Sequence, residues 1–411
     1  MKTTLFLSAL FACSVCNPLG TLAETDIAVP DTNLTYEGYS KNKALKEAAR
    51  AKPIEPLAPT KGTLKAGDQR LGNGKVHGIE KGARPVKPRA YGSAKIPFSA
   101  KRVRNLGQGQ VINAINSNHP GWLSAQWPYS PFGKLTFKKQ DNRSYMCSAQ
   151  LIRKSVIVTA AHCLGGYGSK AFYKDWVFIP AYYNYGGKSS APYGSWRAQT
   201  AVLPGVWYRG NDPQGSKAND LAVIILRKDK NKFVGERTGY LGYATFPYSF
   251  TNSPYTKYNV GSVTAIGYPG SMDSGGVMQI STGPAFQVAY GKAPQYVIGG
   301  YFNGGSSGGG WVVNFGSTGS GVPDFGSGTN AGSAASQAVI GLTSWGDNRS
   351  NTTKRIFSPR FGKNRSYTRN SYMTPTSRVP GAGNLGSILN YACGLKPSGS
   401  SRTYWQLGYC S

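Results

Sequence analysis

Three side chains that lie far apart in the sequence are of the types that together make a hydroxyl group nucleophilic. His162 follows the apolar, strand-like run Ser155-Val-Ile-Val-Thr159 and is itself followed by a cysteine. Asp220 opens a second apolar run, and Ser307 lies in the glycine-rich stretch Gly304-Gly-Ser-Ser-Gly-Gly-Gly-Trp311. A serine hydroxyl is a poor nucleophile at neutral pH unless a base takes its proton and a third group orients that base. These residues supply the three roles in the order His, Asp, Ser.

The chain has three histidines, so imidazole chemistry near neutral pH has few candidates. His119 lies in the turn signature Asn-His-Pro-Gly and His77 in a stretch rich in Lys, Pro and Gly, so we expect neither to be catalytic. Asp220 precedes six apolar residues and is therefore expected at the mouth of a buried strand, where an unpaired charge is costly. It needs a partner such as an imidazole N–H.

The elements that must position these side chains are expected to be strands. Short apolar and aromatic runs separated by turn residues begin near residue 110 and include 133–137, 155–159, 176–179, 221–226 and 338–342. This spacing indicates an all-β barrel or sandwich. Helical periodicity is nearly absent. We expect a long loop over 315–337 and a loop-like chain from Tyr372 to the final cysteine pair.

The N-terminal region has the composition of an export signal followed by a leader that is removed. Lys2, the apolar run 5–12 and small residues near Ala23 predict a secretory signal peptide over residues 1–23, and hence an extracellular or periplasmic protein. Residues 24–104 carry few large apolar side chains, which predicts a poorly structured pro-segment. Its last residues, Lys101-Arg-Val-Arg104, suit proteolytic processing. The alternative is a linker that stays attached.

Four cysteines remain after the predicted signal: Cys147, Cys163, Cys393 and Cys410. An even number in an oxidising compartment predicts two disulfides. Three pairings are possible, and closeness in sequence favours Cys147 with Cys163 and Cys393 with Cys410. Free thiols or a zinc site are weaker alternatives because the four include no Cys-x-x-Cys pair, so we expect no metal.

The formal net charge of +30 raises nucleic-acid binding as a first question. The excess of Lys and Arg is spread along the chain, and no recognisable nucleic-acid motif accompanies it. We therefore expect a basic surface that adheres to anionic surfaces without specificity, and no specific nucleic-acid partner. No later segment is long and apolar enough to predict a transmembrane span.

Further stretches complete a set of motifs with the histidine, aspartate and serine segments. They are 128–135, 177–182, 191–196, Ile266-Gly-Tyr-Pro269, Ser344-Trp-Gly346 and Phe357-Ser-Pro-Arg-Phe-Gly362. Over roughly residues 110–372 the chain resembles trypsin-like serine endopeptidases of the chymotrypsin fold, and among them the V8-like, glutamyl-endopeptidase-like bacterial branch. The resemblance implies two six-stranded antiparallel β-barrels with the active site between them. We expect this domain over 105–375 and a C-terminal extension with a disulfide over 376–411.

Carried over position by position, the resemblance implies a catalytic triad of His162, Asp220 and Ser307. Ser307 is preferred to Ser306 because it is the serine followed by two glycines. The backbone N–H groups of Gly305 and Ser307 would form the oxyanion hole. The implied substrate-binding residues are Tyr301, Phe302, Thr343, Ser344, Trp345 and Gly346. No cofactor is implied.

The chain departs from the family pattern at three positions. Ser306 stands where trypsin has an aspartate that pairs with the N-terminus freed on activation, so activation must work differently. Tyr301 replaces the acid that selects Lys or Arg in trypsin, and Thr343 replaces the histidine used for glutamyl specificity in the V8 branch. The preferred residue is therefore left open, although Tyr301 and Phe302 favour apolar or small side chains.

The leading interpretation is a secreted serine endopeptidase, made as a precursor, that hydrolyses peptide bonds through an acyl-enzyme on Ser307. The alternatives are a catalytically idle, basic protein on the same scaffold that binds polyanions or cell surfaces, and an esterase with the same triad. Protein or peptide substrates are the expected partners.

Overall fold

The computed structural model of the protein describes several ranges of the chain. These are 26–29, 40–54, 99–102, 123–185, 188–213, 215–245, 250–252, 259–290, 293–316, 337–347, 354–362, 364 and 384–411. The predicted signal peptide lies outside the described residues, as do His77, His119, most of the predicted pro-segment and most of the predicted loop 315–337.

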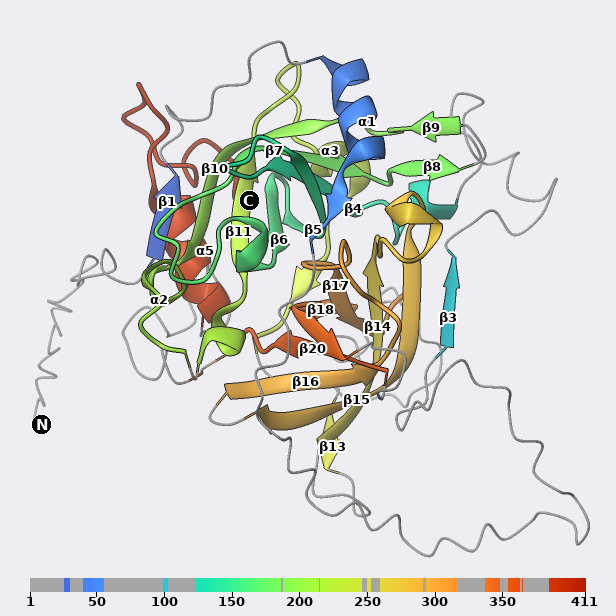
Figure 1. Ribbon diagram of the computed structural model, residues 1–411. Coiled ribbons are helices and arrows are strands. Elements are labelled where there is room, and N and C mark those ends of the chain that lie inside the picture. The colour runs from blue at the N-terminus through green and yellow to red at the C-terminus, as the bar shows by residue number, and fades with distance from the viewer. Residues whose placement is uncertain are drawn as a thin grey trace, which may run out of the picture.

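The described residues form two β-barrels, green above and orange below in Figure 1. The first barrel is made of β4 (Phe132–Lys138), β5 (Ser144–Arg153), β6 (Val156–Thr159), β7 (Lys174–Pro180), β10 (Trp196–Pro204) and β11 (Ala222–Leu226). Its strands follow the order β10-β11-β6-β5-β4-β7, and pairing of β7 with β10 closes the ring. All these neighbours are antiparallel, as predicted.

The second barrel is made of β14 (Asn259–Gly267), β15 (Gln279–Tyr290), β16 (Ala293–Gly299), β17 (Gly310–Val313), β18 (Ala338–Leu342) and β20 (Arg355–Pro359). Its order is β18-β17-β14-β15-β16-β20, and no strand ladder joins β18 to β20 among the described residues. Two hydrogen bonds cross that opening instead: the Leu342 N–H donates to Ser358 Oγ at 2.7 Å and the Ser344 N–H to the Phe357 carbonyl at 2.9 Å.

Smaller elements flank the barrels. The strands are β8 (Tyr183–Tyr185), β9 (Lys188–Ser190), β12 (Gly242–Tyr243), β13 (Thr251–Asn252) and β19 (Trp345–Asp347). The helical segments are η4 (Leu123–Ala125), η5 (Ala161–Cys163), α2 (Gly205–Arg209), η6 (Ser216–Asn219), α3 (Gly235–Thr238), η7 (Asp273–Gly275) and α5 (Asn384–Gly394). None of the helices that the structure describes is both long and apolar enough to span a membrane.

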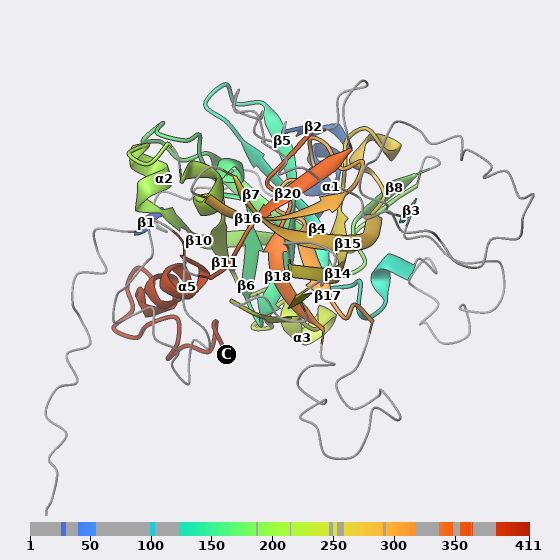
Figure 2. The ribbon, with the colours of Figure 1, turned by 90° about the horizontal axis from the view of Figure 1, so that it is seen from below.

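Helix α5 lies where the sequence was expected to be loop-like, so that expectation was wrong for 384–394. Its apolar residues Leu385, Ile388, Leu389 and Ala392 are spaced as on one helix face, and all four are buried. The helix packs against β1, β10 and β11, on the outside of the first barrel (Figure 2). This cover explains why β11 is an uninterrupted apolar run with every residue buried.

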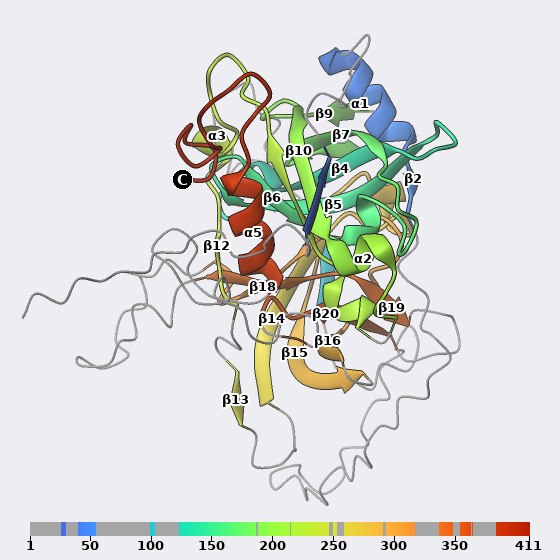
Figure 3. The ribbon, with the colours of Figure 1, turned by 90° about the vertical axis from the view of Figure 1, so that its left-hand side faces the viewer.

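Parts of the predicted pro-segment are built into this fold, which its composition did not predict. Strand β1 (Asp26–Val29) pairs with β10, and β3 (Ser99–Arg102) pairs with β15. Between them, α1 (Lys41–Arg50) and β2 (Lys52–Pro53) lie against the first barrel (Figure 3). Its described residues Val29, Ala44, Ala48 and Ile54 are buried in the same hydrophobic cluster as the core of the first barrel.

A buried lysine of the first barrel holds α1. Lys134 on β4 is 1% exposed, and its Nζ donates to the carbonyl of Ala48 on α1 at 2.7 Å and to that of Gly275 at 3.1 Å. The ammonium also lies 4.7 Å from the ring centre of Tyr182. Burial lowers the pKa of Lys134 to about 7.

The lowered pKa of Lys134 predicts a rise in stability with pH. An unfolded lysine has a pKa near 10.4, so between about pH 7 and 9.5 the unfolded chain binds more protons than the folded chain, and alkali favours folding. The free energy of unfolding by urea should therefore rise with pH in this window. Substitution of Lys134 by Met should flatten the rise by up to about 1.4 kcal/mol per pH unit. Burial also lowers the pKa of Lys217, to about 8. Lys217 therefore makes stability rise with pH as well, and it does so in both proteins. Parallel curves for the two proteins would contradict the prediction.

Candidate active site

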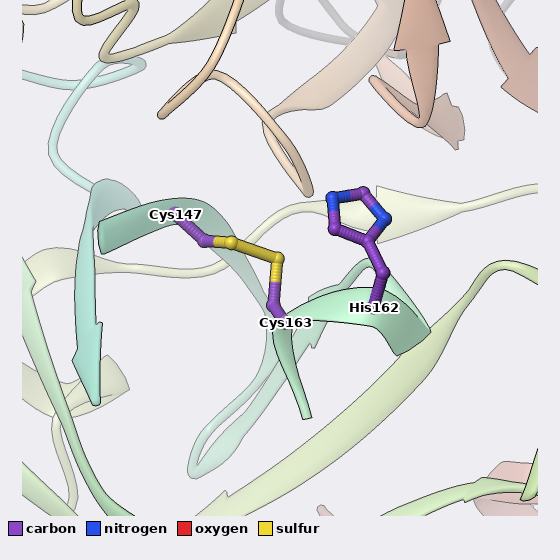
Figure 4. Close-up of side chains that lie close together, drawn as sticks. All are labelled: Cys147, His162 and Cys163. Carbon is purple, nitrogen blue, oxygen red and sulfur yellow. A yellow bond between two sulfur atoms is a disulfide. The ribbon is translucent and has the colours of Figure 1, made fainter. Parts of the chain in front are cut away.

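His162 lies on η5, directly after β6, where the backbone is fixed from several sides. Cys163 forms a disulfide with Cys147 on β5, and Figure 4 shows the imidazole rising beside it. The indole N–H of Trp176 donates to the Cys163 carbonyl at 3.1 Å, and that of Trp207 to the Gly165 carbonyl at 2.9 Å. Both indoles are fully buried, so the segment that carries the imidazole is held by the core of the first barrel.

The two disulfides are those that closeness in sequence favoured, Cys147–Cys163 and Cys393–Cys410. The sulfur atoms of Cys147 and Cys163 lie together with a ring nitrogen of His162. A zinc site would need thiolates, and these sulfurs are bonded to each other. The imidazole is therefore available for proton transfer.

Asp220 follows η6, and its carboxylate is completely buried next to the imidazole. Oδ1 accepts from the backbone N–H of His162 at 3.0 Å, and Oδ2 lies 2.8 Å from His162 Nδ1. Oδ2 also accepts from the hydroxyl of Ser344 at 2.5 Å. Such donors offset the cost of burying the charge. Because the carboxylate faces Nδ1, it favours the tautomer with the proton on Nδ1 and leaves a lone pair on Nε2.

Ser307 lies in a turn of the second barrel that presses against the end of β6. At Gly308, with φ of 81°, a Cβ atom would lie 2.0 Å from Thr159 Oγ1 and 2.9 Å from Ala160 N, so only glycine fits this contact. The Ser307 carbonyl accepts from the Ser148 N–H at 2.7 Å and lies 3.9 Å from the sulfur of Cys163. These contacts bring the serine turn to the histidine segment.

The two atoms that would exchange a proton are both buried and both unsatisfied. Neither Ser307 Oγ nor His162 Nε2 has a hydrogen-bond partner among the described residues. No hydrogen bond joins them in this structure. The neighbouring Ser306 hydroxyl, the rival nucleophile, donates to the Asn303 carbonyl at 2.6 Å. Of the two serines, Ser307 has the hydroxyl that is left for chemistry.

One of the two predicted oxyanion donors is already engaged. Gly305 has φ of 93°, and its N–H donates to the carbonyl of Ile54 at 3.0 Å. Ile54 belongs to the predicted pro-segment, directly after β2. The Gly305 carbonyl accepts from Ser148 Oγ at 2.8 Å. Both backbone groups of Gly305 are therefore hydrogen-bonded, and the partner of its N–H is a residue of the predicted pro-segment.

Several predicted substrate-binding residues have structural partners. Ser344 uses its hydroxyl on Asp220, and Thr343 Oγ1 accepts from the Trp311 indole N–H at 3.0 Å. Phe302 is 1% exposed and packs in the core of the second barrel, so its ring supports the site from within. Trp345 is also buried.

Tyr301 and Gly346 are the partly exposed members of the predicted substrate-binding set. Lys354 Nζ lies 5.9 Å from the ring centre of Tyr301. A Cβ at Gly346 would lie 3.1 Å from the Arg355 carbonyl, which is a tight contact, and 3.5 Å from that of Phe302, which is an ordinary one.

Sequence reasoning missed a cation close to the site. Lys217 on η6, three residues before Asp220, is 5% exposed, and its Nζ lies 3.8 Å from the ring centre of Trp345. Phe357 stacks on the same indole with centroids 3.8 Å apart. Burial lowers the pKa of Lys217 to about 8, and the charge of Asp220 partly opposes this shift. The sequence signal that could have revealed this cation is its position three residues before Asp220.

Comparison with known protein families gives one match that covers more than half of the chain. The family model described as Trypsin matches residues 124–362. This range contains His162, Asp220 and Ser307. No curated protein sequence matches the chain.

Solved structures with similar chains include three proteases. The protease Anisep from Arthrobacter nicotinovorans is 24% identical, with 58% of this chain and 94% of that chain covered and a TM-score of 0.43. The thermostable serine protease AL20 from an extremophilic microorganism is 25% identical over 57% and 92%, with a TM-score of 0.42. A Glu endopeptidase is 17% identical over 58% and 87%, with a TM-score of 0.38.

The contact between Asp220 and Nδ1 predicts the tautomer of His162. In protein labelled with ¹⁵N-histidine, at a pH where the ring is neutral, NMR should find the His162 proton on Nδ1 and not on Nε2. Substitution of Asp220 by Asn should move a large part of the population to the Nε2–H tautomer, because the carboxylate acceptor is lost. Substitution of Ser344 by Ala should not, since the carboxylate remains. An Nε2–H tautomer in the unaltered protein would contradict this assignment.

Proposed function

The chain belongs to the trypsin family of serine peptidases, and on this premise we propose that it hydrolyses peptide bonds with Ser307, His162 and Asp220 as its catalytic triad. The observation that supports the proposal is the arrangement of these three side chains where the two barrels meet. There the buried carboxylate of Asp220 is bound to Nδ1 of His162, and Nε2 and Ser307 Oγ are two buried polar atoms that have no hydrogen-bond partner among the described residues. Unsatisfied buried polar atoms are costly, and functional sites are where such costs are tolerated.

In the proposed mechanism His162 acts first as base and then as acid. Nε2 takes the proton of Ser307 as Oγ attacks the carbonyl carbon of the substrate, and Asp220 stabilises the imidazolium. The same nitrogen then gives the proton to the leaving amine, which leaves an acyl group on Ser307. Water, deprotonated by Nε2, attacks the acyl group and releases the acid and the free hydroxyl. Oγ and Nε2 must first come within hydrogen-bond distance, because the two are not hydrogen-bonded here.

The tetrahedral intermediate carries a negative oxygen that the proposal assigns to the N–H groups of Gly305 and Ser307. Loss of one such donor costs roughly 10²- to 10³-fold in kcat in related chemistry. The Gly305 N–H must therefore be released from Ile54 before full activity is possible. Tyr301, Trp345 and Gly346 remain the residues proposed to contact the substrate, and the V8-like branch remains the proposed place within the family.

Export and processing complete the proposal. Disulfides such as Cys147–Cys163 and Cys393–Cys410 persist in oxidising compartments, which supports secretion after removal of residues 1–23. We propose that cleavage within 101–104 then separates the pro-segment. This site adjoins the end of β3, whose Arg102 pairs with Gln279 on β15.

The triad is tested by comparing variants of the processed protein on casein. Substitution of Ser307 by Ala should abolish turnover and leave the urea unfolding curve unchanged, because the hydroxyl has no partner to lose. Substitution of Asp220 by Asn should lower kcat by about 10⁴-fold, because the wrong tautomer faces Ser307. A kcat loss below tenfold would mean that another group orients His162.

The same assay separates the alternatives. A protein that hydrolyses ester but not amide substrates would be an esterase. An absence of hydrolysis by the processed protein, together with binding to a polyanion that salt abolishes, would favour the idle binding protein.

A further inference from the structure

Residues of the predicted pro-segment form an extended strand at the edge of the site. Strand β2 pairs in parallel with β5, with Lys52 opposite Tyr145 and Pro53 opposite Met146. The next residue, Ile54, extends this pairing because its N–H donates to the Met146 carbonyl at 3.1 Å. Met146 directly precedes Cys147, which is bonded to the cysteine beside His162. The residue that pairs with Ile54 is therefore linked to the segment of the proposed base through the disulfide Cys147–Cys163.

The other edge of this strand contacts the serine turn. The Ile54 carbonyl accepts from the Gly305 N–H, two residues before Ser307. Pro53 packs on Gly270, where a Cβ would lie 2.6 Å from the proline Cγ. The Gly270 N–H in turn donates to the Gly304 carbonyl at 2.6 Å. The segment thus bridges the two barrels, and its hydrogen bonds to both use backbone atoms.

Helix α1 anchors the strand. Ser40 caps the helix by accepting from the Lys43 N–H at 3.1 Å, and Ala44 and Ala48 face the first barrel with 3% and 0% exposure. The Lys134 ammonium holds the carbonyl of Ala48, and the side chain of Ile54 is 6% exposed. Only one residue, Ala51, separates the helix from β2. Release of α1 would therefore remove the support of Ile54.

We propose that residues 40–54 are an internal peptide ligand: α1 anchors it on the first barrel, and the extended residues 52–54 bind between β5 and the serine turn and suppress activity by occupying the Gly305 N–H. The proposal rests on the function proposed above. A donor committed to Ile54 cannot stabilise an oxyanion, which alone accounts for a loss of roughly 10²-fold or more. Because recognition uses backbone hydrogen bonds, the ligand class is an extended peptide, and the leader is its first occupant.

The matched pair Ala48→Arg and Ala49→Arg tests the proposal in the full, uncut chain. Ala48 is buried against the barrel beside Lys134, whereas its neighbour Ala49 is exposed, so the same substitution should undock α1 only at position 48. The readout is the rate of labelling by a fluorophosphonate, with intact mass used to select uncut protein. We expect A48R to be labelled about 10²-fold faster than the unaltered precursor, and A49R to be labelled at the precursor rate.

A second pair covers the case in which A48R does not fold. Substitution of Ile54 by Pro removes the N–H that binds Met146, and Ile54→Val keeps it. I54P should be labelled faster than I54V by a similar factor. Equal rates for all uncut chains, with faster labelling after the cut at 101–104, would overturn the proposal and leave the peptidase function standing. Failure of every chain to be labelled, cut or uncut, would overturn both.

A separate observation assigns a role to the C-terminal extension. Two asparagines beyond the family match hold the loop that presents Asp220: Asn384 at the start of α5 and Asn364. The Nδ2 atoms of both donate to the Ala218 carbonyl, at 2.8 and 3.1 Å, and Asn364 also donates to Asn219 Oδ1 at 2.9 Å. Asn384 is completely buried. We infer that Asn384 is a positioning residue: by holding the Ala218 carbonyl it fixes the position of the Asp220 carboxylate.

The test compares Asn384→Asp with Asn390→Asp on the same helix. N384D keeps the shape and the acceptor for the Leu385 N–H but loses the donor to Ala218, whereas Asn390 is half-buried and near the other end of α5. In the processed enzyme N384D should lower kcat roughly tenfold or more at unchanged KM and shift the acidic limb of the pH profile, since a displaced carboxylate orients His162 less well. N390D should do neither. Equal kinetics for the two variants, with active unaltered enzyme, would overturn the inference alone. Inactive unaltered enzyme would overturn the proposed function as well.

Discussion

The buried carboxylate of Asp220 is the constraint on which the rest of this structure depends. A completely buried charge is tolerated only when hydrogen-bond donors surround it. Here they come from both barrels, since His162 supplies a backbone N–H and a ring nitrogen from the first and Ser344 a hydroxyl from the second. Satisfying this one group therefore fixes the orientation of the imidazole and ties the barrels together where the chemistry is proposed.

Much of this arrangement followed from the sequence. The apolar run after Asp220, the position of His162 and the glycines around Ser307 each have a physical reason that local sequence contains. Gly308 must lack a side chain because the Thr159 hydroxyl and the backbone of Ser148 and Ala160 lie too close for a Cβ. The alternation of short apolar runs and turns likewise predicted strands, and the resemblance to a known family supplied their arrangement in two barrels.

What the sequence did not predict depends on contacts between distant segments. Ile54 contributes backbone atoms, which carry no residue-specific signal. Helix α1 is short and has few large apolar residues, so its docking depends on Lys134, which lies 86 positions after Ala48 in the sequence. Lys134 looks like a surface residue until α1 covers it. Asn384 is a polar residue in the stretch expected to be loop-like, and Asn364 lies just after the motif that ends at Gly362. Only the fold places both on the Asp220 loop.

Ser307 as the activated nucleophile is the central claim, and mapping of a covalent adduct tests it most directly. The processed protein would be inactivated with a fluorophosphonate, digested, and the fragment that spans Ser306 and Ser307 sequenced by mass spectrometry. The account predicts one adduct per chain, on Ser307, because the Ser306 hydroxyl is bound to the Asn303 carbonyl. An adduct on Ser306 or on another residue would contradict it.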